Sequence, residues 1–464
     1  MQSYLSLQEI LKATGGRLIN LCEDNKVLIH PRQICTDTRV IKKGDFFVAL
    51  KGEHFDGSDF IHEAFIKGAI GAMTEKLFLP PWDDFFIVQV RNTLKALQEI
   101  AKFYRQRFSV PIIAVTGSSG KTTVKELIAR ILSIRYPTFK SFGNFNNQIG
   151  VPLSLLNLSP EHKVGVVEFG MNRRGEIENL SRIVQPKVGV ITNVYSSHLG
   201  MLGSTLEIAK AKAEIIPFLN REKDNFLILN KDNPWSDFFY KLATCKVLTF
   251  GIEKEADFMA CNIKDEGIKI SFELVFFKKD RVNLTLNFPG LFNVYNVLAA
   301  SGACFVFGLS LKEIKEGVES FSPLPLRFQI KKYTRCNILD DCYNANPDSV
   351  KIALSVLKKL KGGKKIAVIG DMLELGEYSS KMHESVGEFA ASIRIDALFA
   401  YGEFSPFVVE GAKKGGLKES FWFKDKQELL RKLSGYVKSK DWVLVKGSRK
   451  MKMEEIVEGL GKLQ

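Results

Sequence analysis

Cysteine is scarce in this chain of 464 residues, and its few copies are widely spaced. The seven thiols belong to Cys22, Cys35, Cys245, Cys261, Cys304, Cys336 and Cys342. No two of them form a Cys-x-x-Cys pair, and their number is odd, so the sequence excludes a disulfide framework and argues against a structural zinc site. It indicates free thiols in a reducing compartment, which we expect to be the cytoplasm.

Long apolar runs are also missing. No stretch approaches the roughly 18 uncharged apolar residues that a membrane-spanning helix needs. Residues 1–16, MQSYLSLQEILKATGG, lack a basic segment followed by an apolar core. They are typical of an amphipathic helix rather than of an export signal. We therefore expect no membrane span.

An excess of positive charge is present, but it is not concentrated. Lysine and arginine number 66 against 52 aspartates and glutamates, which gives a net charge of +14. Such a balance suits either nucleic acid or an anionic small substrate. The two signs are interleaved, and no basic stripe with interspersed aromatic residues occurs. We expect small-molecule substrates and no nucleic-acid partner.

The order of expected elements predicts an α/β protein of three domains, in line with roughly 100–200 residues per domain. Residues 1–109 form a small α/β domain with strands near 44–52, 70–73 and 85–90 and helices over 60–69 and 92–108. Residues 110–322 form a mostly parallel sheet with strands at 111–116, 164–169 and 188–194, helices over 124–135 and 204–219, and an antiparallel patch over 257–288. Residues 323–464, which begin within the linker SPLPL (322–326), form a Rossmann-like doubly wound domain with strands at 364–369, 396–400 and 442–445.

The strongest local motif is TGSSGKTT, residues 116–123, between an apolar strand and an amphipathic helix. Glycine allows the backbone to turn tightly, so its N–H groups and the helix N-terminus can bind phosphate oxygens. The predicted nucleotide-binding residues of the loop are Gly117, Ser118, Ser119, Gly120, Lys121, Thr122 and Thr123. In this motif type the lysine reaches the β- and γ-phosphates and the following hydroxyl binds Mg²⁺. The spacing G-x-x-G-K-T is two residues shorter than the common form, which disfavours a GTPase or motor ATPase.

Further polar residues follow the predicted strands and turns. Glu168 ends the strand VGVVEFG, where a carboxylate faces the crevice in which ligands bind. His198 lies in a short loop after the strand VGVITNV, and Lys212 lies inside a helix. Two groups of asparagines either stabilise local structure or contact a ligand. They are Asn144, Asn146 and Asn147 in a loop, and Asn293 and Asn296 at the start of an alanine-rich helix.

Taken together, these motifs resemble the Mur ligase superfamily of ATP-dependent amide-forming enzymes. The short phosphate loop, then Glu168, His198 and Lys212 in order, and then GLFNVYN (290–296) match its central-domain pattern. One branch of the superfamily joins D-alanyl-D-alanine to UDP-N-acetylmuramoyl-tripeptide. This chain is similar to that branch in DTR (37–39), GDFFVALKG (44–52), NFNN (144–147), DDCYNANPDS (340–349), IGDMLELG (369–376) and VKGSR (445–449).

The resemblance implies a role for each matching position. Lys121, His198 and Lys212 would be catalytic, with Lys121 stabilising the transferring phosphoryl group. Two Mg²⁺ ions would be held by Thr122, Glu168, His198 and Lys212, the last as a carbamate derived from CO₂. Asn293 and Asn296 would lie beside adenine, and Arg327 and Asp341 would reach ATP from the third domain. The substrates would contact Asp37, Thr38, Arg39, Asn144, Asn146, Asn147, Asn344 and Asn346. Phe292 and Cys342 depart from the family pattern, where many relatives have histidine and serine.

The resemblance also implies a reaction and its partners. ATP and Mg²⁺ would activate the carboxylate of UDP-N-acetylmuramoyl-tripeptide as an acyl phosphate, and D-alanyl-D-alanine would attack it. We expect a cytoplasmic monomer that acts in peptidoglycan precursor synthesis. The alternatives are an earlier-step Mur ligase, folylpolyglutamate synthetase, or a P-loop regulatory or nucleic-acid ATPase. The domain ahead of the phosphate loop argues against the folate enzyme, and NANPDS and GDMLELG argue against the earlier-step ligases.

Overall fold

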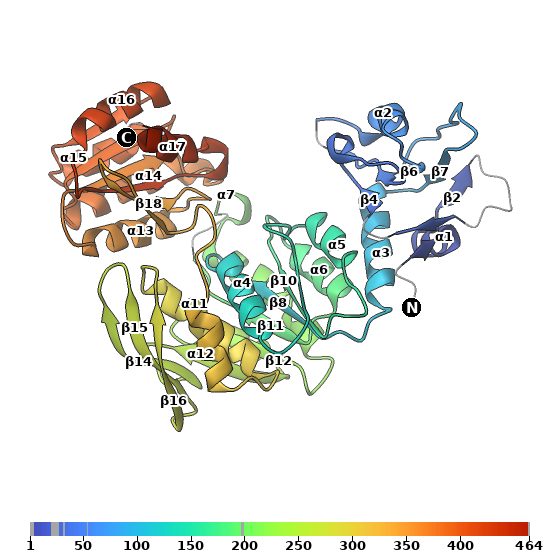
Figure 1. The fold of residues 1–464 in the computed structure, drawn as a ribbon, viewed down its shortest axis with the longest axis horizontal. Coiled ribbons are helices and arrows are strands. Elements are labelled where there is room, and N and C mark those ends of the chain that lie inside the picture. The colour runs from blue at the N-terminus through green and yellow to red at the C-terminus, as the bar shows by residue number, and fades with distance from the viewer. Residues whose placement is uncertain (1–3, 20–26, 31–32, 53, 196–198, 463–464) are drawn as a thin grey trace. The chain divides into compact units, whose positions relative to one another are not determined.

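In the computed structural model, residues 4–19, 27–30, 33–52, 54–195 and 199–462 are described. The chain divides into two compact units: residues 1–114, 135–171 and 175–187 form one, and residues 115–134, 172–174 and 188–464 form the other. The fold is mixed α/β, with mostly parallel sheets (Figure 1). Within the described ranges no helix is long and apolar enough to cross a bilayer, and the six cysteines there are free thiols. The predictions of an α/β fold and of free thiols at those six positions are confirmed, while Cys22 lies outside the described residues.

The N-terminal segment folds around a five-stranded sheet. Its strand order is β2 (Arg17–Ile19), β7 (Phe86–Gln89), β6 (Gly71–Thr74), β5 (Phe46–Val48) and β4 (Ile34–Cys35). Only β2 runs antiparallel to its neighbour. The accompanying elements are β1 (Leu5–Ser6), β3 (Leu28–Ile29), α1 (Leu7–Thr14), α2 (Ile61–Ile66) and α3 (Thr93–Arg105). Phe47, Ile61 and Phe85 belong to the apolar core that holds α2 on this sheet.

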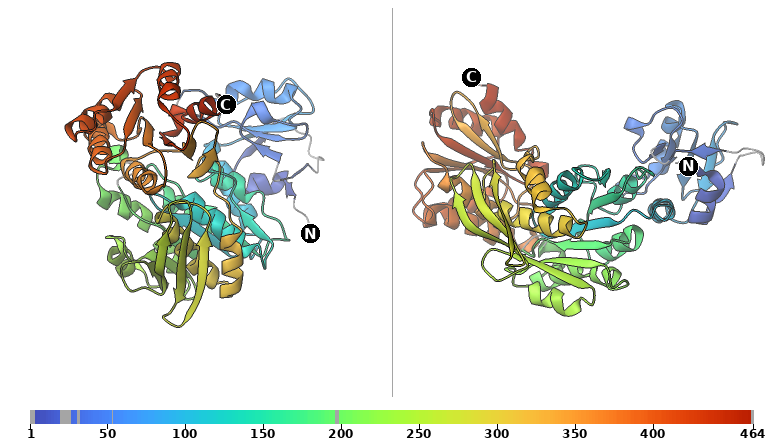
Figure 2. Two further views of the ribbon diagram at one scale, coloured as in Figure 1. Left: turned by 60° about the vertical axis from the view of Figure 1, so that its left-hand side comes forward. Right: turned by 60° about the horizontal axis from the view of Figure 1, so that its bottom comes forward.

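The largest sheet has nine strands in the order β16-β15-β14-β13-β12-β11-β8-β10-β9. The strands are β8 (Ile112–Thr116), β9 (Thr138–Lys140), β10 (Val164–Glu168), β11 (Val188–Ile191), β12 (Phe226–Asn230), β13 (Lys246–Gly251), β14 (Phe258–Asp265), β15 (Ile270–Phe276) and β16 (Asp280–Leu286). The last three pair antiparallel, as the alternating pattern over 257–288 predicts, and lie side by side in Figure 2. The helices are α4 (Lys121–Leu132), α5 (Gly150–Leu155), α6 (Glu176–Val184), α7 (Leu199–Leu202), α8 (Thr205–Ala213), α9 (Ile216–Leu219), α10 (Ser236–Leu242), α11 (Phe292–Phe305) and α12 (Leu311–Glu319).

The single helix predicted over 204–219 is wrong in its extent. Two helices occupy the segment, α8 and α9, because Pro217 has no N–H to continue the ladder and suits the first turn of a new helix. The Ser204 hydroxyl accepts the N–H of Glu207 at 3.2 Å and caps α8. The Glu207 carboxylate does not complete a capping box, since it pairs with Lys210 and Arg174.

The C-terminal segment is doubly wound, as predicted. Its six strands follow the order β17 (Gln329–Lys332), β18 (Asn337–Asp341), β22 (Trp442–Lys446), β19 (Lys365–Gly370), β20 (Ala397–Tyr401) and β21 (Ser420–Phe423), and only β17 is antiparallel to its neighbour. The helices are α13 (Pro347–Lys359), α14 (Ser379–Ser392), α15 (Ser405–Lys414), α16 (Lys426–Tyr436) and α17 (Glu454–Lys462). Alternate residues of each strand face opposite cores: Leu444 packs with α13, α14 and α15, and Val443 packs with α16 and α17.

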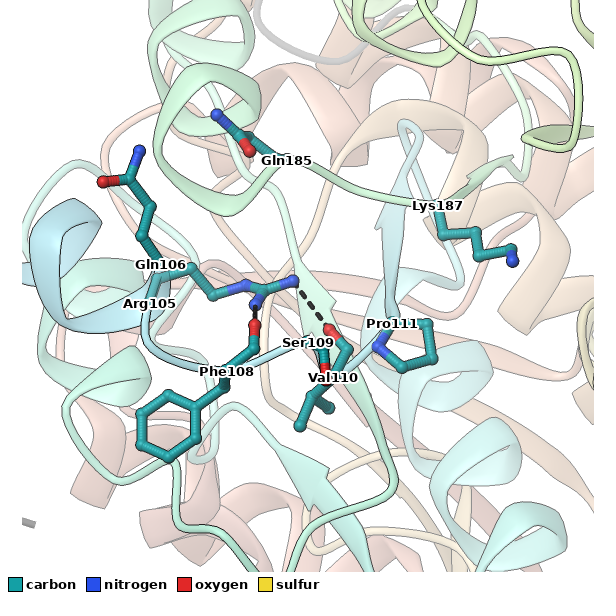
Figure 3. Close-up of a pocket in the computed structure, with 8 residues that line it drawn as sticks. All are labelled: Arg105, Gln106, Phe108, Ser109, Val110, Pro111, Gln185 and Lys187. Carbon is teal, nitrogen blue, oxygen red and sulfur yellow. Dashed lines mark hydrogen bonds between the residues drawn. The ribbon is translucent and has the colours of Figure 1, made fainter. Parts of the chain in front are cut away.

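A buried arginine stabilises the connection between α3 and β8. The Arg105 guanidinium donates to the carbonyls of Phe108, Val110 and Val184 at 2.6, 2.7 and 3.2 Å, and Figure 3 shows it directed at the first two. Burial lowers the pKa of Arg105 to about 10. The residue satisfies carbonyls that follow α3 and end α6, so it fixes the connection to the phosphate-loop strand.

Candidate nucleotide and metal site

The phosphate loop connects β8 to α4 through two glycines with positive φ angles. Gly117 has φ 148° and Gly120 has φ 82°. A Cβ on Gly117 would lie 1.9 Å from the Thr192 hydroxyl, and one on Gly120 would lie 2.4 Å from Asn296 Oδ1. Neither position has room for a side chain, so the tight turn that the motif predicts depends on both glycines. The turn leads into the start of α4, and a helix N-terminus of this kind suits phosphate oxygens.

Thr192 and Asn193, which the sequence did not indicate as site residues, hold the phosphate loop through hydrogen bonds. The Asn193 carbonyl and side-chain oxygen accept the N–H groups of Ser118 and Ser119, at 3.0 and 2.9 Å. The Thr192 hydroxyl donates to the Ser119 carbonyl at 2.6 Å. The N–H groups of Ser118 and Ser119 are therefore hydrogen bonded to Asn193, which follows β11. The signal for this anchor was available, because a Thr-Asn pair directly follows a buried strand.

Lys121 and Thr122 open α4. The Lys121 ammonium donates to the Gly117 carbonyl at 3.0 Å, which folds the side chain back over the loop. The Thr122 hydroxyl is buried and accepts a hydrogen bond from Arg327 at 3.0 Å. Arg327 also lies over the Tyr343 ring, 3.8 Å from its centroid. The predicted arginine thus contacts the phosphate loop.

Thr123 lies on the rim of a small cavity of about 20 Å³. The other residues that line it are Phe288, Phe292, Asn293, Phe321, Pro323, Leu324, Arg327 and Phe328. The rings of Phe292 and Phe328 are in contact at a tilt of 48°, with centroids 4.6 Å apart. The aromatic residue at 292, which departs from the family pattern, therefore forms part of an apolar wall beside the phosphate loop.

Asn293 and Asn296 are buried in the first turn of α11 and hydrogen bond to each other. The Asn296 amide donates to Asn293 Oδ1 at 3.0 Å, and the Asn293 amide donates to the Pro289 carbonyl at 2.7 Å. Asn296 also lies directly against Gly120, so a side chain at position 120 would clash with it. In this structure the pair connects α11 to the phosphate loop, and α11 packs along α4 (Figure 1).

Lys212 lies on α8 and is almost completely buried, with 1% of its surface exposed. Burial, and to a smaller degree the Lys121 cation, lowers its pKa well below the ordinary value. A burial this complete is unusual for lysine unless the residue is paired. A solvated helical lysine, the simplest interpretation of its spacing, is thereby excluded.

Glu168 ends β10 in a buried position, with 2% of its surface exposed. Its Oε1 accepts the Asn146 amide at 2.7 Å, while Oε2 is buried without a hydrogen-bond partner among the described residues. A buried carboxylate oxygen that lacks a donor is costly in apolar surroundings. A bound cation would satisfy it, so this residue fits a hard metal ion such as Mg²⁺.

The remaining loop asparagines mostly serve the local fold. Asn147 Oδ1 accepts the N–H groups of Ile149 and Gly150 at 3.2 and 2.8 Å, so it stabilises the start of α5. The Asn146 carbonyl accepts the Gly170 N–H, which brings this loop to the end of β10. Asn144 is exposed. Asn147 is exposed as well, and Asn146 is half-buried.

The predicted N-terminal substrate residues form one short turn. Asp37 caps a 3₁₀ turn at Thr38–Val40 and pairs with Arg39 at 2.7 Å. Hydrogen bonding to Arg39 lowers the pKa of Asp37 to about 2. The Thr38 carbonyl accepts the Lys67 ammonium at 2.9 Å. The Arg39 side chain is 84% exposed, so a charged group is presented at the surface.

The C-terminal motifs build a polar brace at the carboxyl ends of β18, β22 and β19. Asp341 pairs with the buried Lys446 at 2.5 Å, and the same ammonium donates to the Asn344 carbonyl at 2.8 Å. Asn346 Oδ1 accepts the Ser349 N–H at 2.9 Å and caps α13. The Asn344 and Asn346 groups in these bonds are therefore engaged in the fold. Lys446 was not among the predicted site residues, although it stands in the VKGSR motif.

Asp371 and His383, from the GDMLELG region, extend this brace. Asp371 accepts the N–H of Glu403 at 2.7 Å and of Phe404 at 3.1 Å. His383 accepts the Met372 N–H at 2.9 Å and bonds the Ser379 carbonyl at 2.7 Å. Both are buried, so they shape the loops at this edge of the sheet.

The predicted metal set is only partly visible. His198 lies outside the described residues, which also contain no cluster of three or more His, Cys, Asp or Glu side chains suited to a metal ion. The predicted set does not need such a cluster, because its other members are a threonine hydroxyl, one glutamate and a modified lysine. Thr122, Glu168 and Lys212 are each buried.

A strand, a glycine turn and a helix whose first residues are lysine and threonine define a P-loop nucleotide-binding protein. Three family matches narrow this class. They are the Mur ligase middle domain over residues 115–304, the Mur ligase glutamate ligase domain over residues 326–449, and the Mur ligase family catalytic domain over residues 30–105.

Whole-length relatives agree. The chain is 35% identical to the UDP-N-acetylmuramoyl-tripeptide–D-alanyl-D-alanine ligase of Bacillus subtilis, over 98% of both chains. A crystal structure of MurF from Acinetobacter baumannii superposes with a TM-score of 0.90 at 32% identity, over 99% of both chains. MurF of Thermotoga maritima in complex with ADP gives a TM-score of 0.82 at 28% identity, over 92% of this chain and 97% of that one. The chain belongs to the Mur ligase family.

Proposed function

We propose that this chain joins D-alanyl-D-alanine to UDP-N-acetylmuramoyl-tripeptide at the expense of ATP. The main support is the similarity, over 98% of both chains, to the UDP-N-acetylmuramoyl-tripeptide–D-alanyl-D-alanine ligase of Bacillus subtilis. The phosphate loop that leads into α4 supports it further. The relative solved with ADP supports ATP as the nucleotide. The enzyme then works as a cytoplasmic monomer in peptidoglycan precursor synthesis.

The nucleotide is held by the phosphate loop and by groups around it. Its phosphates lie along Gly117–Thr123, with the Lys121 ammonium moving from the Gly117 carbonyl to the β- and γ-phosphates. Arg327, already at the Thr122 hydroxyl, donates to the γ-phosphate. Asn293 and Asn296, at the start of α11, lie beside adenine. Asp341 keeps Lys446 and the loop after β18 in place for the nucleotide.

Glu168, whose buried Oε2 has no hydrogen-bond partner among the described residues, and Thr122, through its hydroxyl, would hold one Mg²⁺ ion, and His198 would help to hold a second. When bound, Mg²⁺ neutralises phosphate charge and polarises the γ-phosphoryl group. Lys212 contributes as a carbamate. Because burial lowers its pKa, the amine is more often neutral and able to add to CO₂, and the product is an anion suited to metal ions.

The reaction proceeds in two displacements. A carboxylate oxygen of the tripeptide attacks the γ-phosphorus, the bond to the β-phosphate oxygen breaks, and ADP leaves. Lys121 and Arg327 stabilise the charge that gathers on the phosphoryl oxygens. The dipeptide amine then attacks the acyl carbon, loses a proton, and expels phosphate. Asp37, Thr38, Arg39, Asn144, Asn146 and Asn147 hold the UDP-sugar peptide, and Asn344 and Asn346 hold the dipeptide.

A single reaction mixture tests the proposal. Enzyme, Mg²⁺, ATP, the UDP-linked tripeptide and D-alanyl-D-alanine are combined, and the product is weighed by mass spectrometry. We expect the pentapeptide, ADP and phosphate in equal amounts, with either L-lysine or meso-diaminopimelate preferred as the third residue. ATP hydrolysis without a peptide product would overturn the proposal.

A further inference from the structure

We infer that Gln98 is a positioning residue for the ligation: it fixes the loop over residues 144–149 and, through Asn146, aims the Glu168 carboxylate at the metal ion. The inference rests on the proposed role of Glu168. Gln98 lies on α3, whose residues fall in the N-terminal family match over residues 30–105. No motif in the sequence points to it.

Gln98 is buried, and its side chain both donates and accepts hydrogen bonds. Its amide donates to the Gln148 carbonyl at 3.0 Å and to Gln148 Oε1 at 3.3 Å. Its own oxygen accepts the Asn179 amide of α6 at 2.9 Å. With 6% of its surface exposed, Gln98 cannot exchange these partners for water without cost.

Gln148 in turn has its side chain fully engaged. Its Oε1 accepts from Asn179 at 2.6 Å as well as from Gln98, and its amide donates to the Glu176 carbonyl at 2.9 Å. Two helices, α3 through Gln98 and α6 through Glu176 and Asn179, therefore meet on one glutamine of the loop. Such a network holds a backbone in one position when every member is satisfied.

Asn146, two residues earlier in the same loop, carries this order to the site. Its amide donates to Glu168 Oε1 at 2.7 Å, and its carbonyl accepts the Gly170 N–H at 2.8 Å. The bond to Oε1 fixes the plane of the carboxylate, and Oε2 is left without a donor in the part of the chain that the structure describes. Groups that orient a metal ligand in this way tune its affinity for the ion.

Mn²⁺ binding to the ADP complex, followed by electron paramagnetic resonance, tests the inference without relying on turnover. The variants are Gln98→Leu, Gln98→Glu, Asn146→Ala, the double variant Gln98→Leu/Asn146→Ala, and Glu168→Gln. The control is Gln106→Leu, an exposed glutamine at the end of the same helix. Thermal unfolding of each variant reports whether it is folded.

We expect Gln98→Leu and Asn146→Ala each to weaken Mn²⁺ binding about tenfold, Gln106→Leu to leave it unchanged, and the double variant to be no weaker than Asn146→Ala within about twofold. Gln98→Glu keeps the size and the acceptor for Asn179 but cannot donate to the Gln148 carbonyl. It should therefore fold but bind Mn²⁺ more weakly than the unaltered protein does.

The outcomes separate the inference from the proposed function. Unchanged affinity in folded Gln98→Leu and Gln98→Glu, or a full additional tenfold loss in the double variant, would overturn the inference while Glu168→Gln still lowers affinity. If Glu168→Gln itself binds Mn²⁺ as the unaltered protein does, the proposed metal role of Glu168 fails, and the inference fails with it.

Discussion

The Arg327 guanidinium donates a hydrogen bond of 3.0 Å to the Thr122 hydroxyl, although the two residues are 205 positions apart. The contact joins the start of the C-terminal segment to the phosphate-loop helix. It places a permanent cation beside the atom proposed to bind Mg²⁺. We therefore expect Arg327 to turn from the hydroxyl toward phosphate oxygens when Mg²⁺ and ATP bind, since two cations would compete for one oxygen.

Replacement of Arg327 tests this. Arg327→Ala removes a charge-assisted hydrogen bond, so we expect the KM for ATP to rise roughly 10- to 100-fold. Arg327→Lys should recover only part of the loss, because a lysine lacks the planar fork. Arg335→Ala, an exposed arginine nearby in sequence, is the matched control. Equal KM values for Arg327→Ala and the control would contradict the role.

Lys121→Ala removes the cation proposed to stabilise the transferring phosphoryl group. We expect kcat to fall by about 100-fold or more, as when one preorganised charge stabiliser is deleted, with the unfolding midpoint nearly unchanged because Lys121 is only partly buried. Steady-state ligation and urea unfolding measure the two quantities. Ligation within tenfold of the unaltered enzyme would rule out the assigned role.

Lys212→Arg keeps a positive charge but cannot form a lysine carbamate. We expect about a 100-fold loss of kcat, whereas Lys210→Arg on the same helix, which pairs with Glu207 near the surface, should retain activity. Assays in CO₂-depleted buffer add a second measurement. The unaltered enzyme should lose activity there and regain it with bicarbonate. Normal activity of Lys212→Arg would refute the carbamate.

His383 makes stability depend on pH. Its Nε2 accepts the Met372 N–H, so the neutral ring is needed in the folded state, and burial lowers its pKa. Below about pH 6.5 the unfolded chain takes up a proton that the folded chain refuses, so stability is present above that pH and falls as pH decreases toward the folded pKa. The slope contributed is at most ~1.4 kcal/mol per pH unit.

His383→Gln removes this titration. We expect it to cost about 1–3 kcal/mol at pH 8 and to flatten the decline between pH 7 and 5, as measured by urea unfolding. His62→Gln, an exposed histidine, should leave the profile as it is. An unchanged slope in His383→Gln would show that another group is responsible.

Local patterns predicted most of the fold and the phosphate loop, while contacts that depend on strand order escaped them. The loop over 116–123 is determined by its own glycines and by the elements on either side. Thr192 and Asn193 act on it only because β11 lies beside β8, which no spacing along the chain reveals. The same holds for Gln98, whose partners lie 50 and 81 residues away.

Side-chain roles were harder to predict than positions. Asn346 and Asn147 were predicted to bind substrate, yet the Asn346 side-chain oxygen caps α13 and that of Asn147 accepts the N–H of Gly150 at the start of α5. Asparagine suits both tasks, and the sequence alone does not separate them. The boundaries at 109 and 322 and the ligand contacts of the site stay predictions.

The crowding around Gly117 and Gly120 limits how this enzyme can evolve. Because a methyl group at either position would meet Thr192 or Asn296, nearly every substitution there would damage the loop itself. An inhibitor that gains its affinity from the backbone of these two residues would leave few routes to resistance by point mutation at the residues that it contacts.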